Sequence, residues 1–138
     1  MSGRYEILEH TADVGIEAVG ATPEEVFEAS AEGLAGLLGA WFPGEGDPRV
    51  VVVEASDREA LLVAWLDEIV YLREAQDLLF GGFRVNSLSE GELEATVTAA
   101  PAAGREVEEA GIKAATFHRL EVSRQPDGSW RGRIYLDV

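Results

Sequence analysis

Two aspartates, Asp13 and Asp137, stand where a purely structural role is hard to assign. Asp13 precedes a predicted strand and not a helix, so helix capping does not explain it. A carboxylate in that position lowers stability unless it is solvated, hydrogen-bonded or bound to a cation. An Asx turn is the structural alternative for Asp13.

Asp137 is followed only by Val138 in this sequence. The side chain of Asp137 and the terminal carboxylate of Val138 are therefore neighbours, and two such anions repel each other unless a cation or a proton lies between them. With Asp13 nearby, three carboxylates would suit Ca²⁺, Mg²⁺ or Mn²⁺, which all accept oxygen ligands. We expect a divalent metal site at these residues; the alternative is that strand and chain end together by chance.

Four further side chains could support such a site or contact a partner: His10, Glu68, Lys113 and His118. The histidines could be metal ligands, although a lone histidine is more often a structural residue. Glu68 is either partly covered by its apolar neighbours or part of a solvated helix face. Lys113 is the single lysine, and it either contacts a partner or forms an ordinary surface ion pair.

The charge balance argues against direct binding of nucleic acid. The 138 residues include 26 acidic and 11 basic side chains, which gives a formal net charge of −15. A protein that binds RNA or DNA needs a basic face, and this chain lacks the cations to build a large one. Its acidity suits hard cations or a basic protein surface, and it also keeps a protein soluble.

The composition excludes several other classes of protein. The absence of cysteine removes disulfides, zinc–thiolate sites, iron–sulfur clusters and thiol nucleophiles. No apolar run approaches the roughly 18 residues that span a bilayer, and no apolar signal segment follows Met1. We therefore expect one cytoplasmic domain, residues 1–138, without membrane association.

The apolar spacing predicts an α+β fold. Two helices interrupt a series of short strands that pair mostly as hairpins, which favours mostly antiparallel strands in a mixed sheet arrangement packed with two main helices. The predicted strands are residues 4–9, 14–19, 50–54, 83–88, 93–99, 117–124 and 130–138.

Capping signals place the two helices. Thr22, Pro23 and Glu25 predict the start of the first helix. Ser56, in a capping box with Glu59, predicts the start of the second. That helix is expected to end near Phe80, where two glycines follow.

Two further patterns concern the strands. The β-branched run at residues 50–54 predicts a buried strand. The predicted hairpin turns at residues 89–91, and alternation then places four side chains on its outer face: Glu92, Glu94, Thr96 and Thr98.

Four blocks of the sequence resemble the archease family in order and spacing. They are residues 5–16, 64–72, 112–118 and 135–138, and they include the segments His10-Thr11-Ala12-Asp13 and Lys113-Ala-Ala-Thr-Phe-His118. Two residues depart from the pattern: Asp67, where asparagine is expected, and Phe117, where tyrosine is expected.

The resemblance implies the archease fold and a non-catalytic helper of another protein. Archeases stimulate the GTP-dependent RNA ligase that joins 3′-phosphate or 2′,3′-cyclic phosphate ends to 5′-hydroxyl ends in tRNA splicing and RNA repair. They promote guanylylation of the ligase and its multiple turnover. The resemblance also implies a divalent metal on Asp13, Asp137 and Val138. A chaperone-like role towards a tRNA methyltransferase has been proposed for archaeal relatives.

The sequence is also compatible with two competing functions. A small metal-dependent phosphoesterase would use Asp13 and Asp137, with help from His10 and His118, to hold a metal that activates water. However, the sequence offers no clearly placed general base and no cationic clamp for phosphate. The other alternative is a structural binding module whose acids bind no metal.

Overall fold

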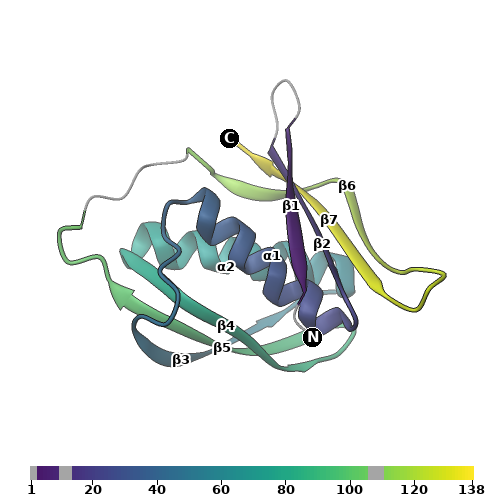
Figure 1. Ribbon diagram of the computed structural model, residues 1–138, viewed down its shortest axis with the longest axis horizontal. Coiled ribbons are helices and arrows are strands. Elements are labelled where there is room, and N and C mark those ends of the chain that lie inside the picture. Colours follow the sequence, from purple (N-terminus) through teal and green to yellow (C-terminus); the bar gives the residue numbers. More distant parts are fainter. Residues whose placement is uncertain (1–2, 10–13, 106–110) are drawn as a thin grey trace.

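Two helices lie between two β-sheets in the computed structural model, which describes residues 3–9, 14–105 and 111–138 (Figure 1). The strands are β1 (Arg4–Glu9), β2 (Val14–Gly20), β3 (Asp47–Glu54), β4 (Leu78–Leu88), β5 (Glu92–Pro101), β6 (Ala114–Arg124) and β7 (Trp130–Asp137), and the helices are α1 (Pro23–Leu37) and α2 (Arg58–Ala75). One sheet has the order β1-β2-β7-β6 and the other β3-β5-β4, and the pairs that these strands form are antiparallel. The predicted α+β class and element order are confirmed.

Trp65 lies at the centre of the core that the helices share with both sheets. The side chain is fully buried, and its indole N–H donates a hydrogen bond to the carbonyl oxygen of Phe27 at 3.0 Å. Phe83 of β4 packs edge-on against it, with ring centroids 6.0 Å apart. Because its one polar atom is satisfied, Trp65 joins α2 to α1 and to the second sheet without a desolvation penalty.

The start of α1 agrees with the capping signals in the sequence. The hydroxyl of Thr22 accepts a hydrogen bond from the backbone N–H of Glu25 at 3.2 Å, and Pro23 occupies the first turn. In the part of the chain that the structure describes, no helix has both the length and the apolar character needed to cross a membrane.

Both predicted ends of the second helix are wrong. The N-cap is Asp57, not Ser56, and its carboxylate accepts from the N–H of Ala60 at 2.7 Å. The helix ends at Ala75, and Phe80 belongs to β4, where its N–H donates to the carbonyl of Ala40 at 2.8 Å.

The two glycines after Phe80 explain why the predicted helix end was misplaced. Gly81 lies so close to the backbone of Glu45 that a side chain could not fit there, and its carbonyl accepts from the N–H of Gly44 at 2.8 Å. This glycine therefore permits a close approach of backbone within a strand and does not stop a helix.

The prediction of a buried strand at residues 50–54 is wrong for one face of β3. This strand is at the edge of its sheet, and Val51 is buried whereas Val50 and Val52 are 65% and 54% exposed. The outer face expected for the hairpin is confirmed, because Leu93, Ala95, Val97 and Ala99 are buried and the residues between them are not.

Replacing Asp57 should separate the observed cap from the predicted one. We expect Asp57→Ala to lower the free energy of unfolding by about 1 kcal/mol, since the N–H of Ala60 loses its acceptor. Ser56→Ala is the matched control and should change it by less than about 0.5 kcal/mol. Urea unfolding measures both, and equal losses would contradict the assignment of Asp57.

Candidate functional site

The pairing of β2 with β7 brings distant parts of the chain to one end of the first sheet. Val14 lies opposite Leu136 on β7 and opposite Glu9 on β1. His10 and Asp13 fall in residues 10–13, outside the described residues, so the predicted role of Asp13 stays a prediction. The residues that flank them are nevertheless placed at the end of the sheet where the chain terminates.

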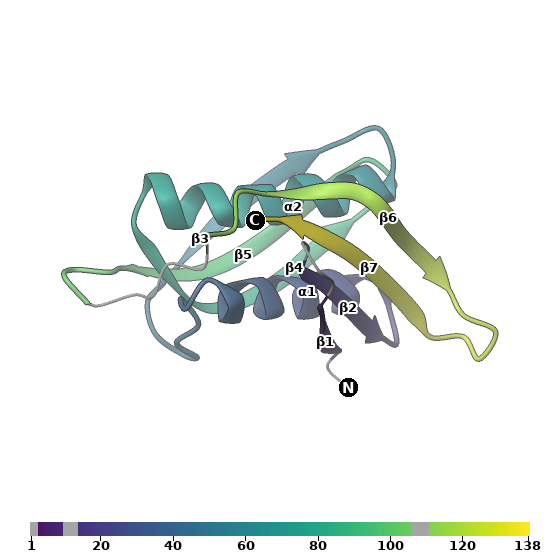
Figure 2. The same cartoon turned by 90° about the horizontal axis from the view of Figure 1, so that it is seen from above.

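Asp137 and Val138 are exposed at this end of the sheet. Asp137 lies opposite Ala114 of β6, and its backbone carbonyl oxygen accepts a hydrogen bond from the backbone N–H of Lys113 at 2.8 Å. Figure 2 shows the end of β7 beside the start of β6. The only lysine of the chain therefore immediately precedes β6, and its backbone is bonded to Asp137, the residue before the chain end.

His118 contacts the same strand a little further from its end. Its ring meets Tyr135 edge-on with centroids 5.7 Å apart, and the backbone N–H of His118 donates to the hydroxyl of Thr116 at 3.2 Å. His118 is exposed, whereas Tyr135 is only 4% exposed. The structure thus places the ring of His118 against Tyr135, which stands two residues before Asp137 in β7.

Glu68 occupies a different environment, half-buried on α2. Among the described residues, no hydrogen bond or ion pair joins Glu68 to Asp137 or Lys113. The structure does not bring Glu68 into the group of residues at the chain end.

Asp67, one residue earlier, makes a contact that sequence reasoning missed. Its carboxylate accepts a hydrogen bond from the backbone N–H of Ala115 at 2.8 Å, so α2 holds the start of β6 two residues from Lys113. Burial raises the pKa of Asp67 above its usual value, although the hydrogen bond from Ala115 acts in the opposite direction. The resemblance to a family with asparagine at this position was the available signal, because an amide oxygen can accept the same bond.

Gly15 is a second residue whose role was missed. It lies opposite Tyr135, and a Cβ at this position would come within 2.9 Å of the Tyr135 ring. The glycine therefore lets the aromatic ring lie across β2, one residue after Val14. A glycine inside a predicted strand is the sequence signal for such a close approach.

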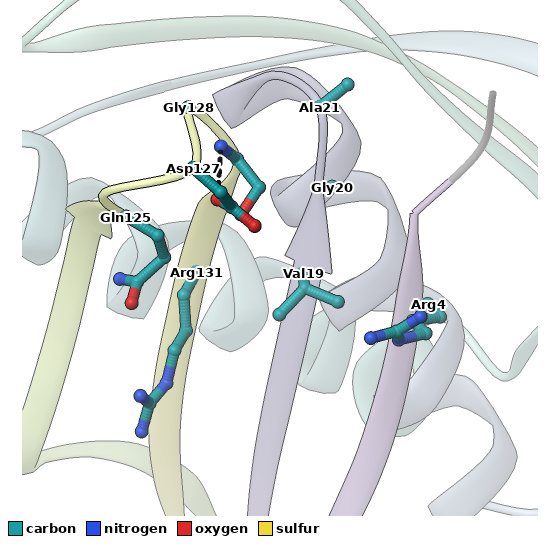
Figure 3. Close-up of a pocket in the computed structure, with 9 residues that line it drawn as sticks. Arg4, Val19, Gly20, Ala21, Gln125, Asp127, Gly128 and Arg131 are labelled. Carbon is teal, nitrogen blue, oxygen red and sulfur yellow. Dashed lines mark hydrogen bonds between the residues drawn. The ribbon is translucent and has the colours of Figure 1, made fainter.

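A pocket of about 670 Å³ lies at the opposite end of this sheet, where Gly20 pairs with Trp130 (Figure 3). Two of its charged side chains, Asp127 and Arg131, are paired within the protein. The carboxylate of Asp127 accepts from the N–H and hydroxyl of Ser129 at 2.9 and 2.6 Å, and these bonds lower the pKa of Asp127. Arg131 is paired with Glu17 at 3.0 Å. We therefore assign no site to this pocket.

The oxygen donors at the chain end are chemically suited to a hard divalent cation. Within residues 3–9, 14–105 and 111–138, no three acidic or histidine side chains form a group that could hold a metal ion. The described donors at this end are the carboxylate of Asp137 and the terminus at Val138. A site with three carboxylates thus depends on the predicted contribution of Asp13.

Comparison with known proteins gives matches along nearly the whole chain. The profile of the Archease protein family matches residues 5–138. The protein named archease from Methanosarcina barkeri is 36% identical over 142 residues, which cover 98% of this chain and 96% of the relative. That from Pyrococcus furiosus is 32% identical over 143 residues, with 98% and 99% covered. The solution structure of protein 1598 of Methanobacterium thermoautotrophicum has a TM-score of 0.79 at 27% identity and covers 97% of this chain and 98% of that one.

Replacing Asp67 tests its contact with β6. Asp67→Asn keeps an acceptor for Ala115 and removes the buried charge, so we expect a higher melting temperature than for the parent protein at pH 7. A raised carboxyl pKa means that the folded state binds its proton more readily than the unfolded state. The parent protein therefore gains stability from protonation of Asp67. This gain is complete below the unfolded pKa and is lost as the pH rises through the folded pKa, so the higher melting temperature of Asp67→Asn should vanish in acid.

Asp67→Ala is the matched control, because it removes both the charge and the acceptor. It should lower the free energy of unfolding by about 1 kcal/mol relative to Asp67→Asn. Thermal unfolding between pH 3 and 8 measures all three proteins. A stability difference between Asp67→Asn and the parent that is independent of pH would contradict the account.

Proposed function

Since these matches show that the chain belongs to the archease family, we propose that it acts as a metal-binding protein cofactor of a GTP-dependent RNA ligase. That ligase joins 3′-phosphate or 2′,3′-cyclic phosphate RNA ends to 5′-hydroxyl ends in tRNA splicing and RNA repair. The protein would promote guanylylation of the ligase and its multiple turnover, and would not itself catalyse a reaction. The observation that carries the proposal is the family match over residues 5–138.

The arrangement at the end of the first sheet supports this role. Asp137 and Val138 are exposed, so a metal held by their carboxylates with Asp13 would lie at the surface and could face a partner. Bound there, a divalent ion supplies positive charge at a site that a second protein can reach. The backbone of Lys113 is bonded to that of Asp137, and we propose that the ammonium group of Lys113 reduces the repulsion between the carboxylates.

The charge of the whole chain supports a protein partner of opposite charge. A net charge of −15 favours association with a basic surface, such as the one that an RNA ligase needs for its own substrate. The same charge disfavours direct contact of this protein with RNA. We therefore propose that the protein contacts the ligase and not the nucleic acid.

An RNA ligation assay with the cognate ligase tests the function directly. With the ligase at a concentration well below that of the RNA ends, we expect one round of joining without this protein and many rounds with it. Guanylylation of the ligase should also become faster. Equal turnover with and without the protein, in the presence of GTP and divalent metal, would contradict the proposal.

Extending the chain beyond Val138 tests the metal site. The extension converts the terminal carboxylate into a neutral amide, so the site loses a negative charge and affinity for Ca²⁺ or Mn²⁺ should fall by about 10-fold or more. Isothermal titration measures this loss. The melting temperature without metal should not change, because Val138 is exposed and the added residues extend into solvent.

The control is an equal extension before Met1, which should bind metal as the parent protein does. If the C-terminal extension left metal affinity unchanged, Val138 would not be a ligand. The site would then have to be rebuilt from Asp13, Asp137 and other side chains.

A further inference from the structure

The pairing of β6 with β7 is interrupted by a large bulge close to the chain end. Thr116 lies opposite Tyr135 and Glu121 lies opposite Arg133, so residues 117–120 face the single residue Ile134. Such bulges redirect side chains out of the regular alternation of a strand, and they are frequent beside functional sites.

Specific contacts hold the bulge in a strained conformation. Arg119 has a φ of 52°, in the left-handed region that non-glycine residues rarely adopt. Its carbonyl oxygen accepts a hydrogen bond from Nε of Arg133 at 3.0 Å, and the preceding ring of His118 packs against Tyr135. The surrounding residues therefore maintain a backbone shape that the sequence does not favour locally.

The consequence of the bulge is an exposed aromatic side chain. Phe117 is 66% exposed, the highest value among the large hydrophobic residues that the structure describes. It lies three residues after Ala114, which is opposite Asp137, so its Cα is about 10 Å along the strand from the level of Asp137. Exposed charged or polar side chains surround it in the sequence at Lys113, His118 and Arg119.

We infer that Phe117 is the apolar anchor through which this protein binds the RNA ligase, and that it enters an apolar recess on the ligase. This inference rests on the proposed function. A central aromatic residue with a polar and charged rim is the usual composition of an energetically important contact between proteins. Lys113 and Arg119 near Phe117 are basic, so the attraction to a basic partner comes from the net charge of −15 of the whole chain and from Asp137 and Val138. The position of Phe117 brings these two residues onto the ligase together with it.

Val50 of β3 provides a control for the substitution of Phe117. Val50 is 65% exposed, nearly the same fraction as Phe117, but it lies on the other sheet. If stimulation depended on exposed apolar side chains in general, substitution of either residue would weaken it. If it depends on a specific contact, only substitution of Phe117 would weaken it.

The test is a titration of the ligase with each variant in the multiple-turnover ligation assay. Phe117→Ser should raise the concentration needed for half-maximal stimulation by about 10-fold or more, which corresponds to about 1.4 kcal/mol. Phe117→Tyr, which keeps the aromatic ring, should restore stimulation to near the parent level. Val50→Ser should behave as the parent protein. Calorimetric affinity for Mn²⁺ and the melting temperature should be the same for all four proteins.

The outcomes distinguish the role of Phe117 as an anchor from the proposed function of the protein. If the parent protein stimulates the ligase and Phe117→Ser does so at the same concentration, the anchor is wrong and the proposed function stands. If Phe117→Ser loses metal affinity or melts at a clearly lower temperature, the residue is structural and the anchor is again wrong. If the parent protein itself gives no stimulation, the proposed function fails and the inference fails with it.

Discussion

The antiparallel pairing of β2 with β7 determines how the beginning and the end of the chain lie relative to each other. It joins the beginning of the chain to its end, from Val14 opposite Leu136 to Gly20 opposite Trp130. Closing so long a loop has an entropic cost, which the buried residues Ile16 and Ile134 offset as they face each other across the pair. If the register shifted by one residue, Gly15 would no longer face Tyr135, and the chain end would move away from the residues that flank the 10–13 segment.

The second sheet and the helices support this pair without forming the candidate site. Trp65 and its bond to Phe27 hold the helices together, and Asp67 extends that support to the first residues of β6. Rigid contacts thus position an exposed anionic end. This combination suits the proposed role, because an unsupported chain end would lose conformational entropy on binding to another protein.

Local patterns in the sequence predicted the order of the elements, the cap at Thr22 and the outer face of the β4–β5 hairpin. Adjacent serine and aspartate residues both suit an N-cap, so only the observed bond from Ala60 distinguishes Asp57 from Ser56. A run of valines does not reveal that β3 is an edge strand, because β-branched residues suit any strand. The end of α2 was misplaced because the role of Gly81 depends on Glu45, which is distant in sequence.

The candidate site was predictable only in part, for a similar physical reason. Asp137 and Val138 could be chosen because charges adjacent in sequence interact in any fold. The proximity of Lys113 depends on the β6–β7 pairing, and the exposure of Phe117 depends on a bulge in that pairing. Neither the bulge nor the contact of Asp67 with Ala115 has a local pattern that would predict it.

We propose that this pairing builds a divalent metal site at the end of the first sheet. Titration with Mn²⁺ followed by NMR tests it directly, because the paramagnetic ion broadens the signals of nearby amides. We expect the amides of Val14, Lys113 and Val138 to broaden first, at low metal concentration, while those of Gly20 and Ser129 at the other end of the sheet stay sharp. First broadening at Gly20 and Ser129, or uniform broadening over the acidic surface, would contradict it.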